Sequence, residues 1–140
     1  SVLEGGRVDG QDRAPPIGMA PRDNALKVEG LDNLYCAGEK AGLLVGHTEA
    51  ICTGTLAGYN AVKTARREKP VVLPDSLAVG DAIGFVRSQM REEGNLSLKY
   101  TFSGSVYFER MKARSLYTTE EKTIRERVHA AGFGEVFAGR

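Results

Sequence analysis

The chain has 140 residues, of which 41% are hydrophobic and 26% are charged, as in an ordinary globular protein with one modest core. Its 19 basic and 18 acidic residues give a net charge of +1, which excludes a general electrostatic attraction to nucleic acid. No apolar run approaches the roughly 20 residues of a membrane span, and the opening residues do not follow the pattern of a secretion signal. We therefore expect no membrane partner and a cytoplasmic location.

The opening segment is rich in glycine and proline and only weakly periodic, and it begins at Ser1. This is typical of a chain that starts partway through a larger protein, so we expect a fragment. Two short strands are predicted next, at residues 26–28 and 34–37. The second is an apolar run that stops at Gly38, as a buried parallel strand does.

A long helix is predicted at residues 48–67, where small and apolar residues recur at steps of three and four. Gly54 and Gly58 cost about 1 kcal/mol each relative to alanine in a helix interior, which indicates close packing against a sheet or a cofactor. The predicted packing face consists of Ala50, Ile51, Gly54, Ala57, Gly58, Ala61, Val62 and Ala65.

A linker follows Pro70, and a second helix is predicted with Asp75 or Ser76 as its N-cap and Glu93 as its last residue. Apolar and polar residues then alternate over residues 96–102, which predicts a half-buried strand. Residues 105–115 are compatible with a strand or a helix, and their charged residues favour the helix.

The last predicted helix covers residues 118–131, because Thr118 and Glu121 have the spacing of a capping box. Gly132 is a natural residue to end it. A final short strand is predicted at residues 136–137. The two cysteines, Cys36 and Cys52, do not form a CxxC motif, so we expect structural thiols and no metal site.

The strand that ends at Gly38, the glycine-rich loop after it and the following helix form a strand–loop–helix unit. Such a unit exposes unpaired N–H groups at the helix start, which suit an anion or a carbonyl oxygen. Glu39 places a carboxylate beside them, which suits sugar hydroxyls. These residues alone therefore indicate a site for a ligand with a polyol chain and an electron-rich end.

The string GLDNLYCAGEKAGLLVGHTEAICTGTLAGYNAV makes this expectation sharper. It resembles the last FAD-contacting motif of the glutathione-reductase-like flavoproteins, in which an AGE strand end leads through a glycine-rich loop to a helix with a G-x-x-A-G-x-N-A pattern. The likeness is greatest to the glucose-inhibited division protein A family and the folate-dependent tRNA methyltransferase flavoproteins. It implies a mixed, helix-rich α/β fold. Residues 1–70 would complete an FAD-binding domain, and residues 71–140 would form a helical cap or interaction region.

The resemblance also implies roles for single residues. Glu39 matches the position that meets the ribityl hydroxyls of FAD, and Gly38 matches the glycine that lets the backbone approach the cofactor. The loop and helix start that would face the pyrimidine end of the flavin comprise Gly42, Gly46, His47, Thr48 and Glu49. No catalytic residue is assigned; His47 is the candidate, as a proton donor or substrate ligand near the flavin.

Two positions depart from those tRNA-modifying families. His47 stands where they carry tyrosine, and Glu39 stands where they usually carry glutamine, which puts the tRNA-modifying role in doubt. Without a role in the chemistry, Glu39 would be an exposed loop acid and His47 a neighbour of the helix cap. Arg22 and Asp23 fall where a substrate-side loop could lie.

The resemblance implies an FAD-dependent oxidoreductase that transfers hydride from NAD(P)H or an organic donor, through the flavin, to a small-molecule acceptor. No GxGxxG motif is present, so the ADP-binding half of the site would come from an N-terminal part of the same protein. The isolated fragment is then expected to be inactive.

Two alternatives remain open. In the first alternative, the longer protein of which this chain is expected to be a fragment modifies tRNA uridines, and Arg110, Lys112 and Arg114 contact the RNA. In the other alternative, the excised chain is a non-enzymatic module that forms homo-oligomers through the apolar face of the long helix.

Overall fold

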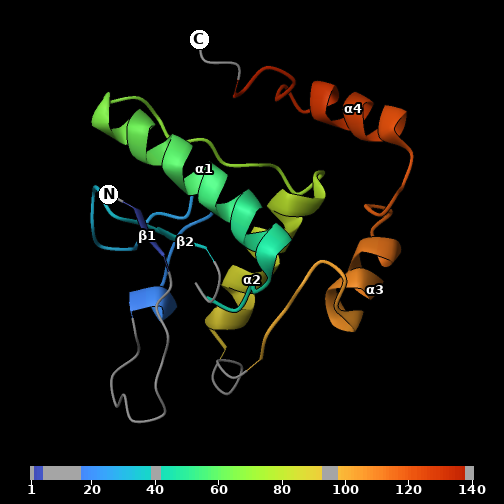
Figure 1. The fold of residues 1–140 in the computed structure, drawn as a ribbon, viewed down its shortest axis with the longest axis horizontal. Helices are drawn as coiled ribbons and strands as arrows, with labels where there is room; N and C mark the ends of the chain where they lie inside the picture. Colours follow the sequence, from blue (N-terminus) through green and yellow to red (C-terminus); the bar gives the residue numbers. More distant parts are fainter. Residues whose placement is uncertain (1, 5–16, 39–41, 93–97, 138–140) are drawn as a thin grey trace.

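The computed structural model describes residues 2–4, 17–38, 42–92 and 98–137. Within these ranges the fold is a mixed, helix-rich α/β arrangement, as the sequence predicts (Figure 1). Its elements in chain order are β1 (Val2–Glu4), the 3₁₀-helix η1 (Ile17–Met19), β2 (Tyr35–Ala37), α1 (His47–Ala65), α2 (Ala78–Met90), α3 (Ser105–Ala113) and α4 (Glu121–Ala130).

The sheet consists of two short parallel strands, with Val2 opposite Tyr35 and Glu4 opposite Ala37. All three residues of β2 are buried, which confirms the predicted buried parallel strand before Gly38. The sequence did not predict β1, because a strand of three residues is too short to show periodicity.

Residues 26–28 do not form the predicted strand. Leu26 adopts a left-handed conformation with φ of 70°, which interrupts an extended chain. The carboxylate of Asp23 accepts the backbone N–H groups of Ala25 and Lys27 and stabilises this turn. Only isolated bridges remain, from Lys27 to Tyr35 and from Val28 to the preceding segment.

Helix α1 packs on both strands and ends close to where the sequence predicts. Arg67 has φ of 59° just past its end, and the N–H groups of Arg67 and Glu68 bond to the carbonyls of Thr64 and Lys63. This pair of bonds is the Schellman pattern, which satisfies carbonyls that the helix leaves free.

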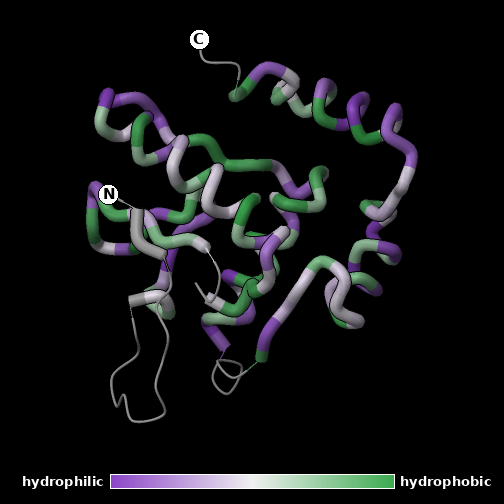
Figure 2. Tube along the Cα trace, viewed as in Figure 1, coloured by the Kyte–Doolittle hydropathy of each residue, from purple (hydrophilic) through white to green (hydrophobic). Residues whose placement is uncertain are grey.

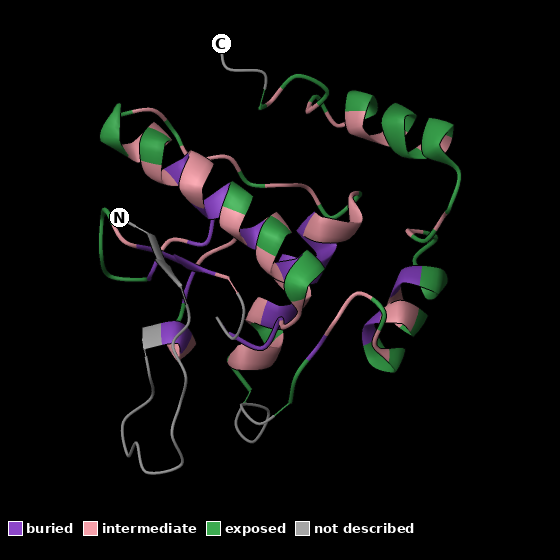
Figure 3. Cartoon of the chain, in the orientation of Figure 1, coloured by how far each residue is buried: buried purple, intermediate pink, exposed green. Residues whose placement is uncertain are grey.

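The predicted packing face of α1 is wrong: of that set only Ala57 is buried, while Ile51 is 69% and Val62 58% exposed. Nothing lies within 4 Å of a Cβ placed on Gly54 or Gly58. The side of α1 that faces the strands is buried (Figure 3), and it carries Glu49, Thr53, Leu56, Ala57 and Asn60.

Specific hydrogen bonds explain why polar residues occupy the buried face of α1. The Asn60 amide donates to the carbonyls of Ala25 and Val71, and its oxygen accepts the N–H of Val71. The Thr53 hydroxyl donates to the carbonyl of Glu49. A periodicity based on hydrophobicity cannot anticipate these partners, because a buried polar group is favourable only where the tertiary structure supplies its bonds.

Helix α2 starts at Ala78, and its N-cap is Leu77, one or two residues later than the predicted Ser76 or Asp75. Residues 75–77 instead form the turn that leads into it. The backbone before this turn lies against the first turn of α2, where a Cβ on Gly80 would lie 2.1 Å from the carbonyl oxygen of Pro74. Ile83 packs with Tyr35 and Leu56 in one hydrophobic cluster. Because this cluster joins residues from both sides of position 70, the division into 1–70 and 71–140 stays a prediction.

The predicted strand at residues 96–102 is absent from its described part, residues 98–102, which make a single parallel bridge between Tyr100 and Leu44. The chain then turns into α3, which confirms the helical alternative for residues 105–115. Helix α3 packs on α2 through Tyr107 and Met111, which meet Ala82.

Helix α4 is confirmed as a helix, but it starts at Glu121 without a capping box. The Thr118 hydroxyl accepts the N–H of Glu120 in a local turn instead. Gly132 ends the helix as predicted, with φ of 82°. The predicted strand at residues 136–137 is a turn, from which the ring of Phe137 meets that of Tyr59 edge-on at 5.0 Å.

The helices differ in how much of their surface they bury. Helix α4 has no buried residue, and Figure 2 shows hydrophilic residues over much of it. The linker after α1 is hydrophobic in the same view, and its Val71 and Leu73 pack against the core. None of the helices described in the structure is long and apolar enough to span a membrane.

Candidate functional site

Three glycines with left-handed backbone carry the chain from β2 to α1: Gly38 with φ of 102°, Gly42 with φ of 70° and Gly46 with φ of 116°. At Gly46, ψ is 163°, a combination that is accessible essentially only to glycine. A Cβ there would also lie 2.8 Å from a carboxylate oxygen of Glu49. Position 46 therefore requires glycine for its conformation, and a side chain there would also displace the Glu49 carboxylate.

The start of α1 presents free backbone donors. The N–H of Ala50 makes the first helical bond, to the carbonyl of Gly46. The N–H groups of His47, Thr48 and Glu49 have no acceptor within the helix, and Gly46 has no side chain to cap them. His47 and Thr48 are exposed, so this helix start lies at the surface and can receive an anion or a carbonyl oxygen.

Glu49 lies behind this helix start and not on the surface. Its side chain is buried, and its carboxylate accepts the backbone N–H of Phe102 at 3.3 Å. A negative charge in the first turn stabilises a helix. Glu49 therefore joins α1 to the segment that precedes α3, a contact that the sequence did not indicate.

Residues 99–102, here called the brace, hold the glycine loop from the C-terminal half of the chain. The N–H of Tyr100 donates to the carbonyl of Leu43 at 2.7 Å, and the N–H of Val45 donates back to Tyr100 at 2.9 Å. The Lys99 ammonium donates to the carbonyl of Gly42 at 3.4 Å, and burial lowers its pKa. The alternation at residues 96–102 was the only signal in the sequence for this role.

The structure groups some of the predicted site residues and separates others. Gly46, His47 and Thr48 lie together at the helix start. Gly38 is half-buried, and its N–H donates to the Thr53 hydroxyl at 3.4 Å. Gly42 is turned inward, where a Cβ would contact Arg22 and Met90.

Glu39 lies outside the described residues. Of the two cysteines, Cys36 is buried and Cys52 is half-buried. Burial and the neighbouring charge of Glu49 raise the pKa of Cys52, which therefore stays protonated at neutral pH. Within the described ranges no group of histidine, cysteine and acidic side chains could hold a metal ion.

Comparison with known families identifies the segment that contains this loop. Residues 18–69 match the family model described as "Glucose inhibited division protein A". Within residues 18–69 the chain is thus similar to the glucose-inhibited division protein A family of flavoproteins. The resemblance expected from the glycine loop is confirmed, and residues 18–69 are called the family segment below.

Curated relatives extend the likeness beyond the family segment. They are named methylenetetrahydrofolate–tRNA-(uracil-5-)-methyltransferase TrmFO. The relative from Bacillus cereus is 30% identical over 110 residues, which is 78% of this chain and 21% of the relative. The relative from Bacillus mycoides is 31% identical over 97 residues, which is 69% of this chain and 19% of the relative. The relative from Bacillus cytotoxicus is 39% identical over 57 residues, which is 41% of this chain and 13% of the relative. The chain thus spans about a fifth of these relatives at most. No solved structure gives a significant match.

Proposed function

We propose that the glycine loop and the start of α1 form the wall of an FAD site that faces the ribityl chain and the isoalloxazine ring. The observation that carries this proposal is the uncapped, exposed N-terminus of α1 directly after the left-handed Gly46, inside the family segment. Glu39 would bind ribityl hydroxyls, and His47 would lie beside the ring as a proton donor or a substrate ligand.

The donor set of this wall suits a flavin. The free N–H groups of residues 47–49 can stabilise negative charge at the pyrimidine end of a reduced flavin, by about 0.3–2 kcal/mol for a helix terminus. A bound flavin would supply two-electron hydride chemistry. The reaction class is therefore hydride transfer from NAD(P)H or an organic donor to a small-molecule acceptor, in an FAD-dependent oxidoreductase.

The rest of the FAD site is proposed to come from the remainder of a longer protein. The family pattern places the pyrophosphate on a GxGxxG unit, which this sequence lacks. In this arrangement residues 1–70 complete the FAD-binding domain. Residues 71–140 form a cap that supports the flavin loop through the brace.

Flavin titration tests this assignment. The protein with its N-terminal remainder is expected to bind one FAD and to absorb in the visible range. The 140-residue chain is expected to bind FAD weakly or not at all. A longer protein that takes up no flavin would contradict the proposal, and a tight yellow complex of the 140-residue chain would contradict the assignment of a partial site.

A second candidate function is tRNA-uridine modification by the same flavoprotein. The names of the relatives favour it, since the Bacillus cereus relative covers 78% of this chain. Two of the residues expected to contact RNA are engaged elsewhere: Arg110 and Arg114 both pair with Asp81. The test is the salt dependence of tRNA affinity of the longer protein, with Lys112→Gln as the variant, because the ammonium of Lys112 has only surface contacts among the described residues, an ion pair with the exposed Glu109 and the ring of Phe108.

The non-enzymatic alternative is self-association of the excised chain. The exposed Ile51 and Val62 on the outer face of α1 favour it. Light scattering during size exclusion decides the question, and a monomer at all concentrations would contradict this alternative.

A further inference from the structure

Arg22 is a buried cation beneath the end of β2. The residue is only 7% exposed. One terminal nitrogen donates to the carbonyl of Cys36 at 3.1 Å, and the other donates to the carbonyl of Gly18. Its Nε is buried and has no hydrogen-bond partner among the described residues. Burial lowers the pKa of the guanidinium, although an arginine stays charged at neutral pH.

No carboxylate in the described part of the chain pairs with Arg22. The neighbouring Asp23 accepts two backbone N–H groups of its own turn. Glu29 pairs with Arg87 and Arg91. Carbonyl oxygens supply only partial charges, and a buried ion without a counter-ion costs several kcal/mol. Among the described residues, Arg22 therefore has carbonyl acceptors at two nitrogens and the thiol of Cys36 beside it, and no carboxylate partner.

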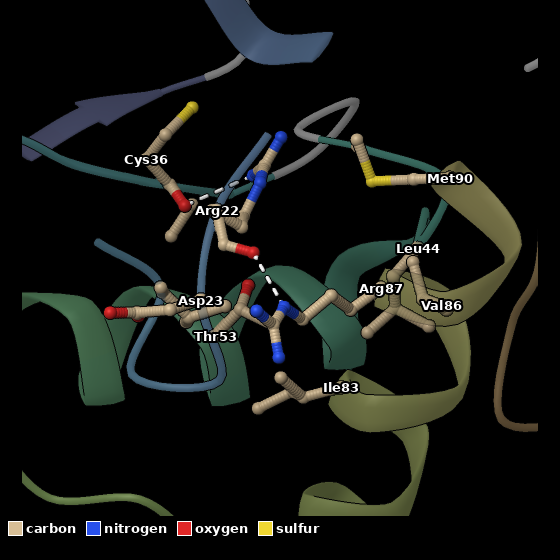
Figure 4. A pocket seen from close by; sticks show the side chains of 12 residues that line it. Arg22, Asp23, Cys36, Leu44, Thr53, Ile83, Val86, Arg87 and Met90 are labelled. Atoms are coloured by element: carbon tan, nitrogen blue, oxygen red, sulfur yellow. Dashed lines mark hydrogen bonds between the residues drawn. The ribbon is translucent and has the colours of Figure 1, made fainter. Parts of the chain in front are cut away.

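A cavity of about 30 Å³ adjoins this guanidinium (Figure 4). Its walls are largely apolar, and they include Ala37, Leu44, Ile83, Val86 and Met90. Arg87 adds a second positive charge to the lining, and its Nε donates to the backbone carbonyl of Arg22 at 3.1 Å. By the same measure one water molecule needs about 10–15 Å³, so the cavity has room for a small planar group such as a carboxylate.

We propose that Arg22 binds the carboxylate of a small organic acid whose charged end enters this cavity. A guanidinium matches a carboxylate in shape and charge, and such pairs are strongest where water is excluded. Two residues that line the cavity belong to the region proposed to face the flavin: Ala37 directly precedes the glycine loop, and Gly42 lies within it. That the acid is the substrate of the oxidoreductase rests on the proposed function; the carboxylate site itself rests only on the geometry of Arg22.

Formate, the smallest carboxylate, is the probe for this site. In the 140-residue chain labelled with ¹⁵N, the Nε–H signal of Arg22 is expected to shift saturably with formate and to stay unchanged with chloride or phosphate at equal ionic strength. Formate is also expected to raise Tm, because it binds the folded chain. Arg22→Gln should lose both responses. Arg66→Gln, at an arginine whose side chain is 67% exposed, should keep both.

The measurement on the unmodified chain decides the proposal even if Arg22→Gln fails to fold. An unchanged Arg22 signal in formate, or an equal shift in chloride, would overturn it. A formate response that appears only in Glu39→Gln would also overturn it, because the chain itself would then supply the carboxylate. Flavin is absent from this experiment, so its outcome is separate from that of the FAD titration.

Discussion

At the residue scale, the clearest requirement is that of Gly46. Its φ and ψ lie in a region that other residues avoid, and the Glu49 carboxylate occupies the space that a side chain would need. The same glycine places free N–H groups at the surface. One position thus determines both the local fold and the chemistry of the proposed flavin wall.

We expect Gly46→Ala to lower the free energy of unfolding by about 1–3 kcal/mol, because alanine is strained there. Gly54→Ala is the matched control, since its Cβ meets nothing within 4 Å and alanine favours a helix by about 1 kcal/mol. Urea unfolding measures both variants. Equal stability of the two would show that the backbone of residue 46 is not strained.

Asp81 is the centre of the polar contacts between α2 and α3. It is 2% exposed and accepts the Tyr107 hydroxyl at 3.0 Å and two nitrogens of Arg110 at 2.9 and 2.8 Å. Arg110 also lies over the ring of Phe85, 4.7 Å from its centre. These bonds compensate a carboxylate that would otherwise be buried alone.

Arg110→Gln is expected to destabilise the chain by about 2–3 kcal/mol, because it leaves Asp81 with fewer bonds while Arg114 remains nearby. Lys112→Gln, at an exposed pair with Glu109, should cost less than about 0.5 kcal/mol. Thermal unfolding of both variants checks this difference. If Arg110→Gln were as stable as Lys112→Gln, Arg110 would again be a fair candidate for contact with RNA.

At the scale of the element, α1 has two faces with different tasks. The inner face packs on the strands through Leu56 and Ala57, and its Asn60 donates a hydrogen bond to the carbonyl of Ala25. The outer face carries Ile51 and Val62 into solvent. The hydrophobic pattern therefore predicts the helix correctly and predicts its orientation wrongly.

Replacement of one large apolar residue on each face distinguishes them. Leu56 is 1% exposed, so Leu56→Ala should cost about 2–4 kcal/mol. Ile51 is 69% exposed, so Ile51→Ala should change stability by less than about 0.5 kcal/mol. Chemical denaturation of the two variants is the measurement. A large loss from Ile51→Ala would mean that the outer face of α1 is covered in solution.

At the scale of the whole molecule, contacts between distant segments hold the fold together. The brace supports the glycine loop, and Asp81 joins α2 to α3. Helix α4 buries no residue of its own, so it adds little to the core. Stability should therefore depend on conditions that affect the contact between α2 and α3.

Acid is such a condition. Burial raises the pKa of Asp81, but the bonds from Arg110 and Tyr107 and the charges of Arg110 and Arg114 outweigh it, so the pKa is lowered. The unfolded chain, with an aspartate pKa of about 3.9, therefore takes up the proton first. The stabilisation is complete above that value and is lost as the pH falls through the lowered pKa.

Urea midpoints measured from about pH 6 down to about pH 2 should thus fall more steeply for the unmodified chain than for Asp81→Asn. The difference should be confined to the region below about pH 4. Parallel curves for the two proteins would mean that the Asp81 carboxylate has the same pKa in the folded and the unfolded chain.

The sequence by itself determined the elements whose signals are local. Glycine and proline punctuation and short-range periodicity predicted β2, α1 and the C-terminal helices, and the motif around Gly38 and Gly46 identified the family. Only the tertiary structure decided which face of α1 is buried, that residues 99–102 brace the loop, and that Asp81 engages Arg110 and Arg114. These depend on partners far apart in the chain, and a polar side chain such as Asn60 or Arg22 is stable inside only where distant backbone groups meet it.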